Sequence, residues 1–298
     1  MATLYQERSS NITRTWIMMI GFVLVVSAVG YAASWYFGDY TFLYAAFGLA
    51  LLTNVWSYWN SDKVALSLTH SRPATREEFF DFYTVAENMA IAAGIPMPKL
   101  YIIDDPAPNA FATGRDEKHA VVAATTGLLS MMNRAELEGV IAHEMSHIKN
   151  RDILLMTMAV VLAGFVAILA DMFLRMSFWG GGNRDNDRGN GGAILMVIAI
   201  IGIVLAPLAA QLIQFAISRR REYLADASGA LLTRYPEGLA SALEKLGAYQ
   251  GPMKNPSHST AHLFIDNPFG DRKSDWINNI FSTHPPVQKR IEALLGKQ

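Results

Sequence analysis

The sequence contains no cysteine, which excludes disulfide bonds, thiolate zinc sites and a cysteine nucleophile. Charged residues are also scarce, at 17 % of the chain compared with roughly 25 % in a typical soluble protein. The formal net charge is −1, so the chain has no basic excess of the kind that indicates nucleic-acid binding. The shortage of charge is not spread evenly along the chain, and its distribution indicates a membrane protein.

Four runs of residues lack charged side chains altogether: 16–37, 40–59, 153–170 and 189–218. A helix of about 20 apolar residues is long enough to cross the hydrocarbon core of a bilayer. A cleaved signal peptide is the alternative for the first run, and a buried hairpin of core helices is the alternative for the last two. We predict four transmembrane helices, arranged as hairpins over 16–59 and 153–217.

If each run crosses the membrane once, the start of the first and third runs and the end of the second and fourth lie on the same side. Lysine and arginine residues cluster at these ends: Arg8, Arg14, Lys63, Lys149, Arg151 and Arg219 to Arg221. Such residues mark the cytoplasmic side of a membrane protein. The glycine-rich link 174–192 would lie outside, although it also contains arginine. We therefore predict that the N-terminal lead 1–15 and the larger segments 60–152 and 218–298 face the cytoplasm.

Residues 60–152 have the mixed pattern of a small soluble catalytic domain. Thr75 and Glu78 predict the start of a helix that runs to about Ala93 and is capped by Gly94. Short β-prone runs follow at 99–103, 109–113 and 120–125. This pattern predicts a mainly α fold with a small β-sheet.

Residues 143–147 read His-Glu-Met-Ser-His, the pattern H-E-x-x-H. Residues four apart lie on one face of a helix, so His143 and His147 can bind one metal ion. Glu144 can then act as a general base on a water molecule. Asn133 and Glu136 have the spacing of a capping box, which predicts that a helix carries the motif. The alternative is a surface helix that holds two solvated histidines by chance.

Two histidines leave a catalytic zinc site one protein ligand short. Glu222 is our candidate for the third ligand of a single Zn²⁺ ion per chain. Asp226, one helical turn later, could accept the free ring N–H of a histidine ligand and so fix its tautomer. The alternative for Glu222 is an ordinary ion pair with the neighbouring arginines 219–221.

The motifs, the four apolar runs in this order and the segment His-Pro-Pro-Val-Gln-Lys-Arg at 284–290 resemble the HtpX-type membrane zinc metalloproteases. The resemblance extends from Arg14 to Leu294. It implies that His284 stabilises the transition state with support from Arg290. The segment Asn109, Ala110, Phe111 and Ala112 is similar to the family's strand beside the active-site cleft, where a peptide could add as a further strand.

The resemblance also implies a zincin-like α+β metallopeptidase domain, formed by 60–152 and 218–298 together and held at the inner membrane of a bacterium. Its expected substrates are damaged or misfolded membrane proteins, and its expected surroundings are the lipid bilayer and other quality-control proteases of the membrane. The expected role is protein quality control under stress.

Three other classes of protein share part of this pattern. An intramembrane zinc protease would carry H-E-x-x-H inside an apolar span, whereas charged residues such as Arg134 and Lys149 flank this motif. A lipoprotein or prenyl-protein processing peptidase would use a similar mechanism, and cleavage of a prenylated peptide would favour it. A membrane scaffold or transporter is disfavoured because the runs carry almost no ionisable groups that could form a pathway.

Overall fold

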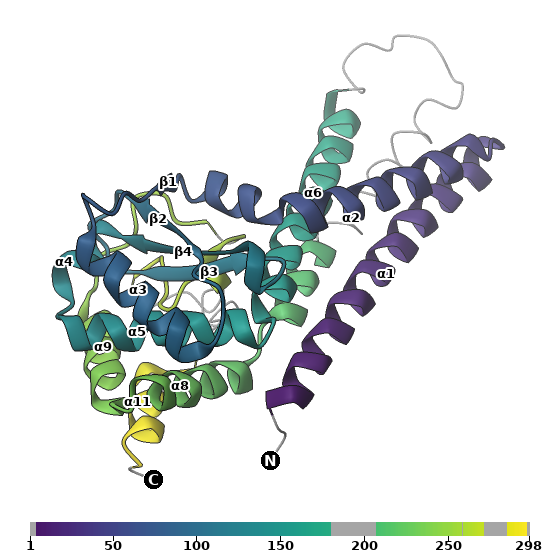
Figure 1. The fold of residues 1–298 in the computed structure, drawn as a ribbon. Helices are drawn as coiled ribbons and strands as arrows, with labels where there is room; N and C mark the ends of the chain where they lie inside the picture. The colour runs from purple at the N-terminus through teal and green to yellow at the C-terminus, as the bar shows by residue number, and fades with distance from the viewer. Residues whose placement is uncertain (1–3, 180–206, 258, 271–284, 297–298) are drawn as a thin grey trace. The chain divides into compact units, whose positions relative to one another are not determined.

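The computed structural model describes residues 4–179, 207–257, 259–270 and 285–296 (Figure 1). The chain divides into two compact units, which we describe separately. The first unit comprises residues 1–15, 59–158 and 217–298, and the second comprises 16–58 and 159–216. Three long helices run from one unit into the other: α1 (Leu4–Phe37), α2 (Thr41–Leu68) and α6 (Asp152–Trp179).

The first unit contains a four-stranded mixed sheet in the order β1-β2-β4-β3. Strand β2 pairs with β4 in parallel, while β1 and β3 pair with their neighbours in antiparallel. Strand β3 therefore lies at an edge of the sheet. The strands are β1 (Arg72–Pro73), β2 (Lys99–Ile103), β3 (Ala110–Gly114) and β4 (Ala120–Thr125).

Helix α5 is the central helix of this unit, because it packs against α3, β3, α8 and α9 (Figure 1). One hydrophobic core joins these elements and includes Phe82, Ile102, Ile141 and Leu243. The remaining elements of the unit are α3 (Phe80–Ala93), η1 (Glu117–His119), α4 (Thr126–Met131), α5 (Arg134–Lys149), α8 (Arg219–Thr233), α9 (Pro236–Ala248), η2 (Ala261–Leu263) and α11 (Val287–Leu294). The predicted mainly α fold with a small sheet is confirmed.

The capping box predicted at the start of α5 is confirmed. The side chain of Asn133 accepts a hydrogen bond from the main-chain N–H of Glu136, whose carboxylate accepts one from the N–H of Asn133. The same carboxylate accepts hydrogen bonds from Lys245 and Ser241 of α9 at 2.7 Å each. The cap thus fixes the start of α5 and ties the helix to its neighbour.

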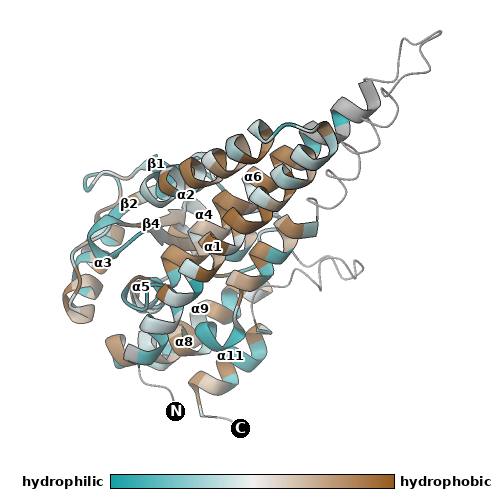
Figure 2. Ribbon diagram, turned by 90° about the vertical axis from the view of Figure 1, so that its right-hand side faces the viewer, coloured by the Kyte–Doolittle hydropathy of each residue, from teal (hydrophilic) through white to brown (hydrophobic). Residues whose placement is uncertain are grey.

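The transmembrane candidates lie mostly in the second unit. Within the described part of the chain, two helices are long and apolar enough to cross a membrane, one over Gln6–Phe37 and one over Asp152–Asp171. Their apolar character is visible along α1 and α6 in Figure 2. We predicted four such helices, so this number is corrected to two. Helix α2 is long but is not one of these two helices, and most of the fourth run, 189–206, lies outside the described residues.

Helices α1 and α2 nevertheless pack as a close hairpin within this unit. A Cβ added at Gly30 would lie 2.4 Å from Cβ of Ala46, so only glycine permits this approach. Nδ2 of Asn54 donates a hydrogen bond to the main-chain oxygen of Met19 at 3.0 Å. Many large apolar side chains of this hairpin are exposed, among them Ile17, Leu24, Trp35, Leu52 and Trp56.

Candidate active site

Helix α5 places the three residues of the H-E-x-x-H motif in the interior of the first unit. His143 and Glu144 are each 1 % exposed, and His147 is 4 % exposed. The Nε2 atoms of the two histidines lie 3.1 Å apart, one helical turn from each other. Burial on this scale contradicts the alternative of two solvated histidines on a surface helix.

Helix α8 brings Glu222 to the same place. Its carboxylate oxygens lie 3.6 Å from Nε2 of His147 and 3.9 Å from Nε2 of His143. The two helices approach each other at Gly229, where an added Cβ would lie 3.0 Å from the main-chain nitrogen of His143. The glycine therefore permits the close packing that places Glu222 opposite the histidines.

The donor set of these three residues fits a divalent metal ion. Their ligand atoms all lie within 4.8 Å of one another, and all three side chains are buried. Two ligands that bind a tetrahedral ion at 2.0–2.1 Å are roughly 3.3 Å apart, close to the separations in this site. Two imidazole nitrogens directed at each other beside a carboxylate need a cation or a proton between them, and the arrangement of His143, His147 and Glu222 could hold a metal cation.

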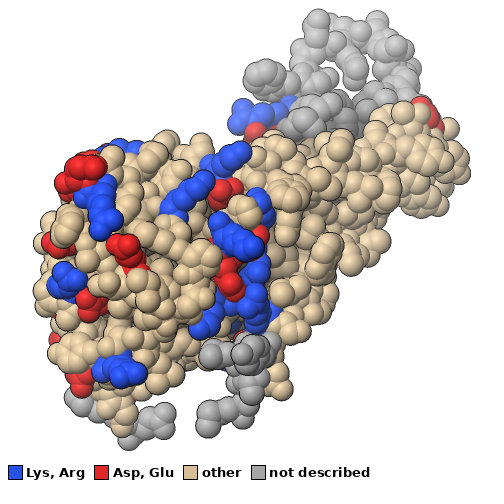
Figure 3. All heavy atoms as spheres, viewed as in Figure 1, with Lys and Arg blue, Asp and Glu red and all other residues tan. Residues whose placement is uncertain are grey.

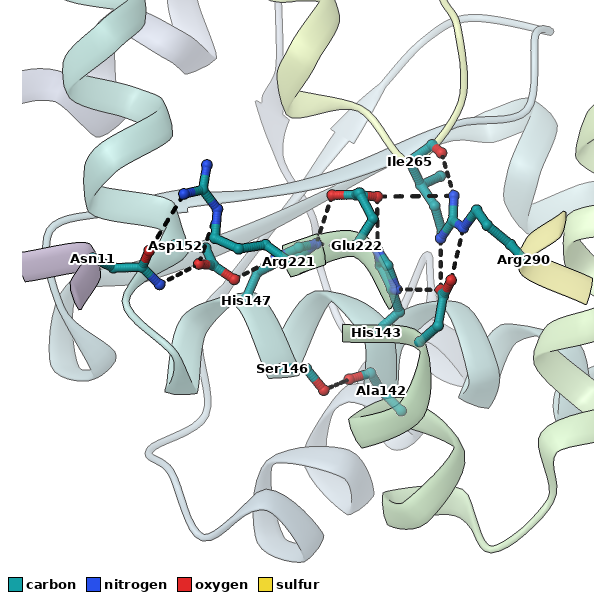
Figure 4. A network of polar contacts seen from close by, with 11 residues as sticks. Asn11, Ala142, His143, Ser146, His147, Asp152, Arg221, Glu222, Ile265 and Arg290 are labelled. Atoms are coloured by element: carbon teal, nitrogen blue, oxygen red, sulfur yellow. Dashed lines mark hydrogen bonds and ion pairs between the residues drawn. The ribbon is translucent and has the colours of Figure 1, made fainter. Parts of the chain in front are cut away.

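A carboxylate supports His143 on the far side of its ring. Oδ1 of Asp226 lies 3.0 Å from Nδ1 of His143. The guanidinium of Arg290 donates two hydrogen bonds to Asp226, at 2.7 and 2.8 Å. It donates a third to the main-chain oxygen of Ile265 at 3.2 Å (Figure 4). The structure thus brings Asp226 to a histidine of the pair and Arg290 to Asp226. His284, for which Arg290 was expected to provide support, lies outside the described residues.

A second carboxylate supports His147, and our sequence analysis missed it. Oδ2 of Asp152 lies 2.9 Å from Nδ1 of His147. Oδ1 of Asp152 accepts a hydrogen bond from Asn11 and lies 3.5 Å from Nε of Arg221 (Figure 4). The sequence offered one signal for this role: Asp152 stands at the very start of a long apolar run, where an unpaired charge is energetically unfavourable.

Burial raises the pKa of Glu144 to about 7, against the effect of the nearby His147 and a hydrogen bond from the main chain of Ala112. A carboxyl group with a pKa near neutrality can both accept and deliver a proton at physiological pH. The hydrogen bond also shows that Glu144 lies beside the edge strand β3.

The surroundings of the two histidines shift their pKa values in opposite directions. Burial lowers the pKa of His143. Burial also acts to lower the pKa of His147. The hydrogen bond to Asp152 and the negative charge of Glu222 outweigh this effect and raise the pKa of His147 to about 9. A histidine binds a metal ion in its deprotonated form, so metal binding at His147 would compete with a proton.

The segment predicted as the substrate strand, 109–112, forms the first three residues of β3 and the residue before it. The side chain of Asn109 is hydrogen-bonded within the fold. Its Nδ2 donates to the main-chain oxygen of Asp266 at 2.9 Å, and its Oδ1 accepts a hydrogen bond from the N–H of Asp266 at 3.2 Å. The oxygen of Ala110 accepts a hydrogen bond from Ile265, and Phe111 stacks edge-to-face on Phe264. Residues 264–266 thus cover one end of this edge, and Ala112 is the residue of the segment whose main chain reaches Glu144.

Comparison with known proteins identifies the family. The sequence profile of Peptidase family M48 matches residues 76–298. The "Protease HtpX homolog" of Caldanaerobacter subterraneus subsp. tengcongensis is 49 % identical over 98 % of this chain and 97 % of the relative. Relatives with the same description are 43 % identical in Ligilactobacillus salivarius (98 % of this chain, 99 % of the relative) and 48 % identical in Thermococcus sibiricus (94 % of each). The chain therefore belongs to peptidase family M48, as an HtpX-type metalloprotease.

Proposed function

We propose that this protein is a zinc-dependent endopeptidase, anchored in the bacterial inner membrane, that cleaves damaged or misfolded membrane proteins at the cytoplasmic surface. The observation that carries the proposal is the convergence of His143, His147 and Glu222 within 4.8 Å, with Glu144 on the same helix. Two imidazoles and one carboxylate are the ligand set of a catalytic zinc. Magnesium and calcium prefer sites built from oxygen ligands alone, which makes them poorer candidates.

His143, His147 and Glu222 would hold the ion. When bound, zinc would supply a Lewis acid that polarises the scissile carbonyl and makes a water molecule more acidic. Glu144 takes the proton from the attacking water and later delivers it to the leaving amine, a role suited to a buried carboxyl group with a pKa of about 7. We assign His284 as a donor to the developing oxyanion on the resemblance to the family and on the need for such a donor.

The edge strand β3 supports a proposal for substrate binding. A peptide that pairs with the edge near Ala112 and Gly114 would lie beside Glu144, because the main chain of Ala112 is hydrogen-bonded to that carboxylate. Pairing through the main chain selects extended segments more than particular side chains. Unfolded or damaged proteins offer such segments, so this mode of binding agrees with a role in quality control.

The distribution of charge and apolar surface supports the membrane anchor. On the face seen in Figure 3, the acidic and basic side chains lie almost entirely on the first unit, and the described part of the second unit is nearly uncharged. Exposure of large apolar side chains such as Leu24 and Leu52 is energetically unfavourable in water but not in lipid. We therefore propose that the apolar helices anchor the protein in the membrane, that the first unit faces the cytoplasm, and that the protein contacts other membrane proteases.

Metal analysis combined with digestion of β-casein tests the catalytic proposal. The wild-type protein in detergent should contain one zinc ion per chain and cleave casein. Glu144→Gln should keep the zinc and lose cleavage. Glu138→Gln is the matched control, because Glu138 lies on the same helix but pairs with Arg134 at 3.3 Å, away from the ligands. Equal cleavage by wild type and Glu144→Gln would refute the assigned role.

A further inference from the structure

A buried amide on α1 contacts the residues that support His147. Asn11 is 1 % exposed. Its Nδ2 donates hydrogen bonds to Oδ1 of Asp152 at 2.5 Å and to the main-chain oxygen of Asn150 at 3.0 Å. Its Oδ1 accepts a hydrogen bond from Arg221 at 3.4 Å (Figure 4). The reverse orientation would direct the amide oxygen at two acceptor oxygens, so these contacts fix which way the amide points.

The two histidine ligands differ in how their carboxylates are held. Asp226 receives two short hydrogen bonds from Arg290, at 2.7 and 2.8 Å. The arginine beside Asp152 is Arg221, and its Nε lies 3.5 Å away. Asn11 therefore supplies a short hydrogen bond to Asp152 in the place that an arginine takes at Asp226.

We propose that Asn11 is a positioning residue for the metal ligand His147, and that it acts through Asp152. Oδ2 of Asp152 lies 2.9 Å from Nδ1 of His147, which favours the tautomer with its proton on Nδ1 and a free lone pair on Nε2. Asn11 holds Oδ1 of the same carboxylate, so the carboxylate cannot turn away from the ring. The start of the first membrane helix is thereby part of the metal site. This inference rests on the metal site proposed above.

The test compares the zinc affinity of variants of the full-length protein in detergent, measured by competition with a chelator. Loss of an outer hydrogen-bond partner of a metal ligand typically weakens metal binding about 10–100-fold, and we expect Asn11→Ala to fall in this range. The absorption bands of the cobalt-substituted protein should also change, since His147 would be held less firmly. Thr15→Val is the matched control, because Thr15 is buried one turn further along α1 and its hydroxyl bonds only to the main-chain oxygen of Asn11 in the described structure.

A double-mutant cycle shows whether Asn11 acts through Asp152. If it does, the variant with both Asn11→Ala and Asp152→Ala binds zinc about as weakly as Asp152→Ala alone. Thermal unfolding with zinc chelated separates positioning from stability, because Asn11→Ala should then unfold near the temperature of Thr15→Val. Should Asn11→Ala not fold, Asn11→Ser replaces it in the same cycle.

Two results would overturn the inference: zinc affinity of Asn11→Ala within twofold of Thr15→Val, or fully additive losses in the cycle. The metal site itself is checked by His147→Ala. If His147→Ala loses zinc while Asn11→Ala does not, the positioning role fails and the metal site stands. If wild type and His147→Ala bind zinc equally, the proposed metal site fails first.

Discussion

The carboxylate of Asp152 lies 2.9 Å from Nδ1 of His147, and Asp226 has the same relation to His143 at 3.0 Å. Each histidine therefore presents Nε2 to the other and Nδ1 to an aspartate. Each aspartate in turn lies beside a buried arginine, Arg221 in one case and Arg290 in the other. Both histidines thus have an aspartate beside Nδ1, although the two aspartates are held differently, and each can be tested separately.

Asp152→Asn keeps the shape of the side chain but removes the charge that holds the proton on Nδ1 of His147. We expect zinc affinity to fall about 10–100-fold. Asp171→Asn serves as the control on the same helix, since Asp171 is exposed and pairs with Arg175. Chelator competition measures both variants, and an unchanged affinity in Asp152→Asn would contradict this role.

Arg290→Met should destabilise the fold strongly. The substitution leaves Asp226 buried without its arginine and removes the hydrogen bond to Ile265, a change that typically costs about 3–5 kcal/mol. Denaturant unfolding with zinc chelated measures the free energy of unfolding. Arg134→Met removes a solvent-exposed pair with Glu138 and should have little effect. Similar stabilities of the two variants would argue against a structural role for the buried pair.

Gly229→Ala should separate α8 from α5. The added Cβ would lie 3.0 Å from the main-chain nitrogen of His143, and a main chain cannot yield as a flexible side chain can. We expect a loss of about 1–3 kcal/mol in stability together with weaker zinc binding, because Glu222 moves with α8. Gly164→Ala in α6 is the control, since nothing lies within 4 Å of its added Cβ. Wild-type zinc affinity in Gly229→Ala would show that this contact does not position Glu222.

The lowered pKa of Glu136 leads us to expect that its contribution to the stability of the fold depends on pH. Burial acts to raise its pKa, but hydrogen bonds from Lys245, Ser241 and the N–H of Asn133 outweigh burial and hold it below its usual value. A depressed pKa in the folded state stabilises the fold above the unfolded pKa of about 4.3, and this contribution disappears as the pH falls below it. The stability difference between wild type and Glu136→Gln should therefore be largest at neutral pH and shrink toward pH 3. Thermal unfolding with zinc chelated measures it, and a difference that does not change with pH would contradict the assignment.

Local patterns in the sequence predicted those parts of the site that lie along one helix. The spacing of His143 and His147, and that of Glu222 and Asp226, places each pair one turn apart, and the cap at Asn133 confirmed the helix for the first pair. The predicted strand runs at 99–103, 109–113 and 120–125 correspond to β2, β3 and β4. The helix predicted from Thr75 begins instead at Phe80, and the residues before it form a turn in which Oγ1 of Thr75 accepts a hydrogen bond from the N–H of Glu78.

Apart from the contact of Asp152 with His147, five positions away, the contacts that the sequence did not reveal join distant segments. Asn11 is hydrogen-bonded to Asp152, which is 141 positions away in the sequence, and Arg290 is hydrogen-bonded to Asp226, which is 64 positions away. No helical or strand periodicity relates such residues, because their proximity depends on how whole elements pack. Of the four predicted transmembrane helices, the described residues show two: α2 is not among the candidates, and most of the fourth run, 189–206, lies outside the described residues.

The coordination of the metal is the central claim, and X-ray absorption at the zinc edge tests it most directly. The zinc-loaded wild-type protein should show two imidazole nitrogens and at least one oxygen at about 2.0–2.1 Å, and Glu222→Ala should lose an oxygen ligand or the metal itself. A spectrum without imidazole scattering, or one that is identical in wild type and Glu222→Ala, would contradict a site formed by His143, His147 and Glu222.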